Sequence, residues 1–71
     1  MKYYFALHMT PEEFLPYYQG KVHTILVTSH QGEKLQFPAM HLRPYLYSDG
    51  INGSFCLHSE NNKFLSLIKV K

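Results

Sequence analysis

Apolar and polar residues alternate along several short stretches of this chain, and glycine or proline separates most of them. Residues 3–9 alternate weakly and are largely apolar on both faces, as expected for a strand that is covered on each side. Residues 22–29 are rich in β-branched side chains and predict a second strand. Residues 34–37 alternate again after a turn at Gly32, so the pattern predicts a β-hairpin.

The sequence between the first two strands carries the signals of a helix N-terminus. Residues 10–13 read Thr-Pro-Glu-Glu, in which Thr10 can cap the helix and Glu13 can complete a capping box. Proline suits the first helical position because its missing N–H would have no partner there, and both carboxylates lie at the positive end of the helix dipole. We therefore predict a short helix over residues 11–19.

This helix should pack on the sheet through an aromatic face. Pro16 removes one backbone hydrogen bond, so the helix is expected to kink or stop there, and Gly20 is expected to cap its C-terminus. Phe14, Tyr17 and Tyr18 share one face because they are three and four residues apart. We expect that face to lie on the sheet.

The next segment, residues 38–47, is apolar but interrupted. Pro38 and Pro44 lie within it, and they exclude a long helix or a central strand. One helical turn over residues 39–42, followed by an extended stretch over residues 43–45, is compatible with both prolines.

Turn signals and alternation return in the last third of the chain. Residues 49–53 contain the turn pairs Asp-Gly and Asn-Gly on either side of Ile51. Residues 54–58 predict a fourth strand, and a turn over residues 61–63 leads into a fifth strand at residues 64–70. Together the elements predict an α+β domain: a five-stranded, mostly antiparallel bent sheet or small open barrel, with one short helix after the first strand.

The length of 71 residues has room for one domain, which we place at residues 1–71. A chain of this size buries only about 60% of the surface that its unfolded form exposes, so small domains often need disulfides or metals. Cys56 is the only cysteine, which excludes an intramolecular disulfide and suits a reducing compartment. Six tyrosines and five phenylalanines can supply the core instead.

The charge pattern gives little support for a polyanionic partner. The formal net charge is +2, and the seven lysine and arginine residues are scattered along the chain. The N-terminal apolar stretch is short, is interrupted by His8 and is followed by acidic residues, so it predicts neither a signal peptide nor a transmembrane span. We expect a cytoplasmic protein that does not associate with membranes.

Three short motifs give the chain a family resemblance. They are Tyr-Tyr-Gln-Gly at residues 17–20, Phe-Pro-Ala-Met-His-Leu-Arg-Pro-Tyr at residues 37–45 and Gly-Ile-Asn-Gly-Ser-Phe at residues 50–55. In this order and spacing they resemble a family of small gamma-proteobacterial proteins of unknown function, and the Leu-Arg-Pro segment is the most specific part. The resemblance covers nearly the whole chain and implies a stand-alone bacterial cytoplasmic domain, but it implies no activity, cofactor or partner.

The histidines are numerous but do not form a metal-binding pattern. They are His8, His23, His30, His41 and His58. Zinc sites need three or four ligands and usually include a close pair, whereas these residues are widely spaced. Cys56 and His58 share one face of a strand, and two ligands alone bind a metal weakly. We expect two semi-exposed residues on the outer face there, and no metal or cofactor.

No group of residues supports catalysis. A cysteine nucleophile needs a base and an orienting group, and Cys56 has only His58 beside it, on a strand rather than at a helix N-terminus. Glu12 and Glu13 are adjacent and point about 100° apart on a helix, so helix capping accounts for both. Residues 49–53 lack the spacing and the following helix of a phosphate-binding loop. We expect no catalytic residues and no enzymatic activity.

The stretch His-Leu-Arg-Pro-Tyr-Leu-Tyr is the candidate binding surface. If it is extended, His41, Arg43, Tyr45 and Tyr47 project the same way. Guanidinium and aromatic groups on one surface suit stacking on nucleic-acid bases or binding a protein partner. The alternative is structural: both tyrosines complete the small core, and Arg43 pairs with Asp49 or with a backbone carbonyl.

The sequence supports three functional interpretations. The absence of a catalytic set and the small core favour a non-catalytic interaction module, monomeric or homodimeric, whose contact surface includes residues 41–47. The second is a single-stranded nucleic-acid binder on a small barrel, supported by stacking aromatics and opposed by the modest charge. The third is a small-molecule binder or an enzyme, which would need a dimer interface to enclose a pocket of roughly 300 Å³.

Overall fold

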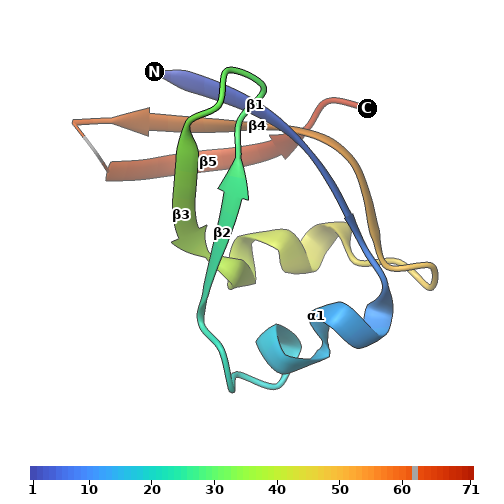
Figure 1. Cartoon of the computed structure of the whole chain (residues 1–71). Helices are drawn as coiled ribbons and strands as arrows, with labels where there is room; N and C mark the ends of the chain where they lie inside the picture. The colour runs from blue at the N-terminus through green and yellow to red at the C-terminus, as the bar shows by residue number, and fades with distance from the viewer. Residues whose placement is uncertain (62) are drawn as a thin grey trace.

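The computed structural model of the chain describes residues 1–61 and 63–71, which contain five strands, one α-helix and one 3₁₀-helix (Figure 1). In chain order the elements are β1 (Lys2–Met9), α1 (Pro11–Tyr18), β2 (Thr24–Thr28), β3 (Lys34–Pro38), the 3₁₀-helix η1 (Ala39–Tyr45), β4 (Ile51–Glu60) and β5 (Lys63–Lys69). The α+β class expected from the sequence is confirmed. None of the described helices is long and apolar enough to cross a bilayer.

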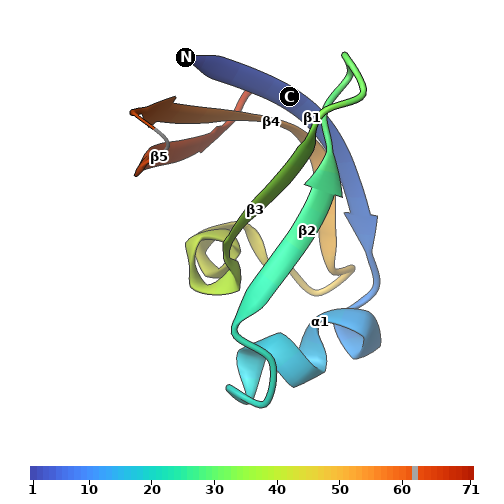
Figure 2. The ribbon, with the colours of Figure 1, turned by 60° about the vertical axis from the view of Figure 1, so that its left-hand side comes forward.

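The strands form two antiparallel sheets rather than the single sheet that the sequence suggested. β1, β4 and β5 form a three-stranded sheet in the order β1-β4-β5, and β2 and β3 form a separate hairpin. The hairpin meets β1 near its tip, where the N–H of His30 donates to the carbonyl of Tyr4 (2.8 Å). Away from this contact the hairpin runs down toward the two helices (Figure 2), so the strands do not close into a barrel.

The core fills the space between the three-stranded sheet, the hairpin and the two helices. Phe5 and Phe55 pair across β1 and β4, and their ring centroids are 5.6 Å apart. Phe37 reaches them from β3, with its centroid 5.9 Å from that of Phe5. Phe14 from α1 and Leu42 from η1 are almost completely buried. Each helix is thus anchored to the core by a large apolar side chain.

Helix α1 begins with the capping box that the sequence predicts. The N–H of Glu13 donates to the Thr10 hydroxyl (3.2 Å), and the N–H of Thr10 donates to a carboxylate oxygen of Glu13 (2.9 Å). Pro11 occupies the start of the helix, where a missing N–H removes no bond. The helix start is therefore encoded locally, and its prediction is confirmed.

Replacing Thr10 with alanine is expected to lower the free energy of unfolding by about 1 kcal/mol, because the N–H of Glu13 loses its acceptor. Urea unfolding followed by circular dichroism measures the change. Thr10→Ser keeps a hydroxyl at the same position and should stay within about 0.5 kcal/mol of the parent chain. An equal loss in both variants would contradict a capping role for the hydroxyl.

Helix α1 ends at Tyr18, just before the predicted end, and Gly20 follows with φ of +78°. Pro16 lies inside the helix without ending it. Phe14 is buried as expected, and Tyr17 stacks on it with ring centroids 5.6 Å apart. Tyr18 does not lie on the sheet, since its side chain is 53% exposed. Its ring instead packs against a guanidinium from η1, which belongs to the surface described below.

The turn prediction succeeds at Gly50 and fails at the second Asn-Gly pair. Tyr47 and Gly50 bridge a tight turn, in which Gly50 has φ of +100°. Asn52 and Gly53 lie inside β4, because β4 begins at Ile51 and pairs with the whole of β1. Long-range pairing thus overrides the local turn propensity of Asn-Gly.

The segment between β3 and β4 also differs from its prediction. Residues 39–45 form one continuous 3₁₀-helix, so the extended stretch expected over residues 43–45 is wrong. β2 begins at Thr24, later than the predicted start at residue 22. The turn predicted over residues 61–63 includes Asn62, which lies outside the described residues.

Candidate interaction surface

The four candidate residues on and after η1 do not form the single row that an extended segment would give. Side chains three residues apart are eclipsed in a 3₁₀-helix, whereas these four are two residues apart. Ala39, Leu42 and Tyr45 form the row that packs on the core. Met40 and Arg43 form the next row, and both are exposed. The helical period therefore separates residues that the sequence pattern had grouped.

Two of the candidates join η1 to the three-stranded sheet. His41 stacks on Phe64 of β5, with ring centroids 4.0 Å apart. Tyr45 packs edge-on against Phe55, at 5.4 Å between centroids, and its hydroxyl donates to the carbonyl of Leu67 (3.0 Å). The position of Tyr45 agrees with the structural alternative, in which the tyrosine completes the core.

Arg43 closes the C-terminal end of α1. Its Nη2 donates to the carbonyl of Tyr18 (2.7 Å), and its guanidinium carbon lies 4.8 Å from the centre of the Tyr18 ring. A cation is favoured at this end of a helix, where backbone carbonyls have no partner within the helix. The bond to a backbone carbonyl is the alternative that the sequence left open for Arg43. Tyr47 stays exposed, with the Lys69 ammonium 5.3 Å from its ring centre.

A groove of about 300 Å³ lies between the end of α1, the loop that follows it and η1. Its lining residues are Tyr17, Gly20, Val22, His23, Pro38, Met40 and Arg43. Met40 is 66% exposed and Val22 is 41% exposed, so apolar side chains stand open on both sides. Tyr18 adds a third exposed apolar surface through its stack with Arg43.

The groove combines apolar surface with positive charge. Arg43 and His23 line it, Lys21 lies in the adjoining loop, and none of the lining residues is acidic. Of the four candidates from the sequence, only Arg43 lines the groove. Sequence reasoning missed Met40 and Val22. The three-residue spacing of Ala39, Leu42 and Tyr45 was the available signal, since it predicts that Met40 and Arg43 face away from the core.

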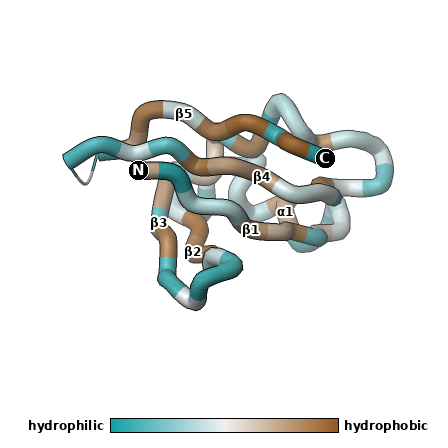
Figure 3. The backbone as a smooth tube through the Cα atoms, turned by 90° about the horizontal axis from the view of Figure 1, so that it is seen from above, coloured by the Kyte–Doolittle hydropathy of each residue, from teal (hydrophilic) through white to brown (hydrophobic). Residues whose placement is uncertain are grey.

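Cys56 lies on the opposite side of the molecule, on the outer face of the three-stranded sheet. The register places Tyr4, Cys56 and Ile68 in one row across β1, β4 and β5, and Figure 3 shows this sheet from above with hydrophobic stretches on β4 and β5. Tyr4 and Ile68 flank the thiol, which leaves Cys56 only 4% exposed. The expectation that both Cys56 and His58 are semi-exposed is therefore wrong for the cysteine, while His58 is partly buried.

No cluster of three or more potential metal ligands occurs in the part of the chain that the structure describes. On the outer face of the sheet, His58 lies opposite Lys2 of β1 and Ser66 of β5. Neither neighbour is a ligand that zinc prefers. The lining of the α1–η1 groove offers apolar side chains, the guanidinium of Arg43 and the imidazole of His23.

Comparison with known proteins connects the chain to one family. Residues 1–70 match the model of a family described as a protein of unknown function (DUF2835). No match was found among curated proteins or among solved structures. The matched region includes every strand and helix described above, so the family description applies to the whole fold.

Proposed function

We propose that this chain, which belongs to the DUF2835 family of proteins of unknown function, is a non-catalytic module that binds a protein partner through the groove between α1 and η1. The exposed side chain of Met40 beside the stacked Arg43 is the observation that carries the proposal. We place the module in the cytoplasm, because its single cysteine is unpaired and buried, as suits a reducing compartment.

Met40 supports a binding role because its exposure has no structural benefit. Single exposed apolar residues are ordinary, but contiguous ones around a groove commonly mark interaction sites. Val22 lines the same groove as Met40, and the exposed Tyr18 adjoins the groove through its stack with Arg43. Covering the exposed part of Met40 with a partner would contribute about 1–2 kcal/mol to binding.

Arg43 is suited to orient the partner. Its guanidinium is held by the Tyr18 carbonyl and ring, so little side-chain entropy remains to be lost when a partner binds. A guanidinium has five N–H donors, and one of them serves Tyr18. The others suit a carboxylate, so the expected partner segment carries an apolar side chain beside an acidic residue.

A photo-crosslinking phenylalanine analogue at position 40 tests the proposal in cells that express the chain naturally. We expect one dominant protein adduct from position 40, which mass spectrometry would identify. The same analogue at position 68, where Ile68 is 52% exposed on the outer face, should not give that adduct. Identical adducts from both positions, or adducts with nucleic acid alone, would contradict the proposed protein-binding groove.

Met40→Ser is expected to weaken binding of the crosslinked partner by about tenfold while changing the free energy of unfolding by no more than about 0.5 kcal/mol. Calorimetric titration and urea unfolding measure the two quantities on the same sample. Ile68→Ser is the matched control, since it removes a similar exposed side chain outside the groove. Equal losses of affinity in the two variants would show that the groove is not the binding site.

A further inference from the structure

The hydrogen bonds of the hairpin fix which backbone groups of β3 face away from β2. The N–H of Ser29 donates to the carbonyl of Glu33 (2.7 Å), and the N–H of Ala39 donates to the carbonyl of His23 (2.9 Å). The two bonded pairs lie just beyond the two ends of the β2–β3 ladder and keep its register. Hydrogen-bonded and non-hydrogen-bonded pairs alternate along an antiparallel ladder. Between these two pairs, residues 35 and 37 of β3 therefore bond to β2. The N–H and C=O groups of residues 34 and 36 therefore point to the free edge of β3.

This edge has no hydrogen-bonding partner within the residues that the structure describes, since no other backbone or side-chain group bonds to the N–H or C=O of Lys34 or Gln36. Each outer edge of the other sheet is bonded at one point. β1 accepts a bond from the hairpin at Tyr4, and β5 accepts one from Tyr45. Pro38 also sits on the free edge of β3, where its missing N–H removes no ladder bond.

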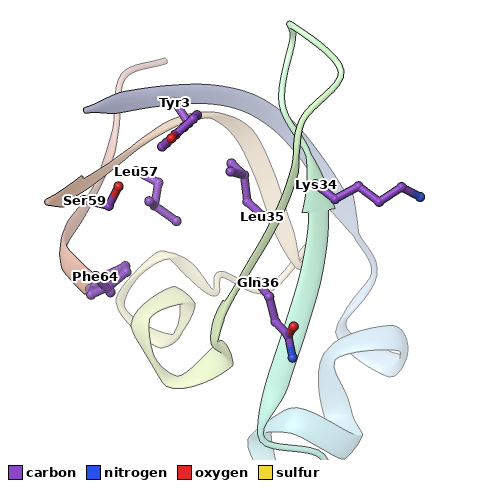
Figure 4. Close-up of a pocket in the computed structure, with 7 residues that line it drawn as sticks. All are labelled: Tyr3, Lys34, Leu35, Gln36, Leu57, Ser59 and Phe64. Atoms are coloured by element: carbon purple, nitrogen blue, oxygen red, sulfur yellow. The ribbon is translucent and has the colours of Figure 1, made fainter. Parts of the chain in front are cut away.

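A hollow lined by both apolar and polar side chains adjoins the same edge. It has a volume of about 210 Å³ and lies between β3 and the β4–β5 hairpin. Figure 4 shows the side chains of Tyr3, Leu35, Leu57, Ser59 and Phe64 around this space, whereas those of Lys34 and Gln36 point away from it. The alternation of β3 thus places apolar surface on the inner side of the free edge and polar groups on its outer side.

We propose that the free edge of β3 binds an extended segment of a protein partner, which adds to the hairpin as an antiparallel strand. Lys34 and Gln36 can each donate and accept one bond, so the added strand would gain up to four backbone hydrogen bonds. The residue opposite Leu35 would place its side chain in the hollow, where Leu35, Leu57 and Phe64 offer apolar contacts to it. A carboxylate suits the position opposite Lys34.

The unpaired backbone groups determine the kind of partner. Donors and acceptors that alternate along one strand edge are complemented by another extended backbone, and not by a helix, whose backbone groups are already paired. The edge is short and ends at Pro38, with the charge of Lys34 beside it. Such features limit indiscriminate pairing of exposed edges, so only a short segment should bind. The hollow beside this edge shares no lining residue with the α1–η1 groove, and Pro38, at the end of the edge, is the one residue common to the edge and the groove. The proposal does not depend on the function proposed for that groove.

A synthetic heptapeptide, acetyl-Thr-Val-Thr-Leu-Glu-Val-Thr-amide, is the probe. Its central Thr-Leu-Glu is designed to lie opposite residues 36, 35 and 34. NMR titration to millimolar peptide should give saturable shifts at the amides of Lys34 and Gln36, together with slower hydrogen exchange there. N-methylation of the central Thr and Glu should weaken binding by roughly tenfold or more, because two hydrogen bonds are lost. N-methylation of the Leu should be tolerated, because its N–H faces away from β3.

Gln36→Pro tests the edge from the side of the protein. It removes the free N–H and should weaken the binding of the peptide by roughly tenfold. Gln36→Ala keeps the N–H and should bind the peptide as the parent chain does. The N-methylated peptides decide the matter if Gln36→Pro does not fold. No shifts at millimolar peptide, equal binding of all N-methylated forms, or shifts confined to another surface would overturn the proposal. Slow exchange of Lys34 and Gln36 in the free protein, with a dimer in sedimentation, would assign the edge to a second copy and also overturn it.

Discussion

Gly50→Ala is expected to remove more than about 3 kcal/mol from the free energy of unfolding. Gly50 has φ of +100°, which alone costs a residue with a Cβ about 1–2 kcal/mol. The added Cβ would also overlap the carbonyl oxygen of Met9 and would lie 3.1 Å from the carbonyl carbon of Thr10. These are backbone atoms at the end of β1, so relief would require the β1–β4 pairing to shift.

Gly32→Ala is the matched control for this experiment. Gly32 has φ of +92°, but a Cβ there would meet no atom within 4 Å. We expect a loss of about 1–2 kcal/mol, from backbone conformation alone. Urea unfolding of both variants, followed by circular dichroism, measures the difference. Equal losses would show that the contact with Met9 is absorbed without cost.

Phe55→Ala is expected to leave little or no folded protein. Phe55 is fully buried, stacks on Phe5 and meets the edge of Tyr45. Removing such a ring costs about 3–5 kcal/mol, because burial is lost and a cavity remains. A domain of this length has a free energy of unfolding of about 4–10 kcal/mol, so the expected loss is a large part of its total stability.

The spread of amide resonances in a two-dimensional NMR spectrum and the urea midpoint report the outcome for Phe55→Ala. Ile68→Ala is the comparison, because Ile68 lies on the neighbouring strand but is half exposed. It should cost about 1 kcal/mol or less. A well-dispersed spectrum and an unchanged midpoint for Phe55→Ala would show that the core can repack around the missing ring.

The elements that sequence predicted well are those whose signals are local. The capping box at Thr10 and Glu13 involves groups three residues apart, so their identities alone specify the helix start. The β2–β3 hairpin is similar, since its two strands are joined by a short turn at Gly32. In both cases the interacting groups are close in the chain, and tertiary packing reinforces the local preference.

The elements that sequence missed depend on contacts between distant residues. Asn52 and Gly53 have strong turn propensity, but pairing of β4 with β1 extends the strand through them. The division into two sheets likewise depends on how far β2 lies from β1, which no local pattern reports. The type of most elements and the pairing within the local β2–β3 hairpin were therefore accessible from the sequence, whereas the pairing of strands that are distant in the chain was not.

The candidate surface shows the same limit in a smaller segment. Two prolines suggested that Arg43 and Tyr45 lie on an extended stretch, for which a period of two applies. The 3₁₀-helix has a period of three, so Tyr45 packs on the core while Arg43 turns toward Tyr18. Only the position of α1, set by tertiary packing, reveals that Arg43 and Met40 border a groove.

The pairing of β1 with β4 also constrains the order of events during synthesis. β1 leaves the ribosome first, but its hydrogen-bonding partner is made only after α1, the hairpin and η1. At about 5–20 residues per second, this delay lasts roughly 3–10 s. The nascent chain therefore carries the aromatic-rich residues 2–9 without their strand partner throughout that interval.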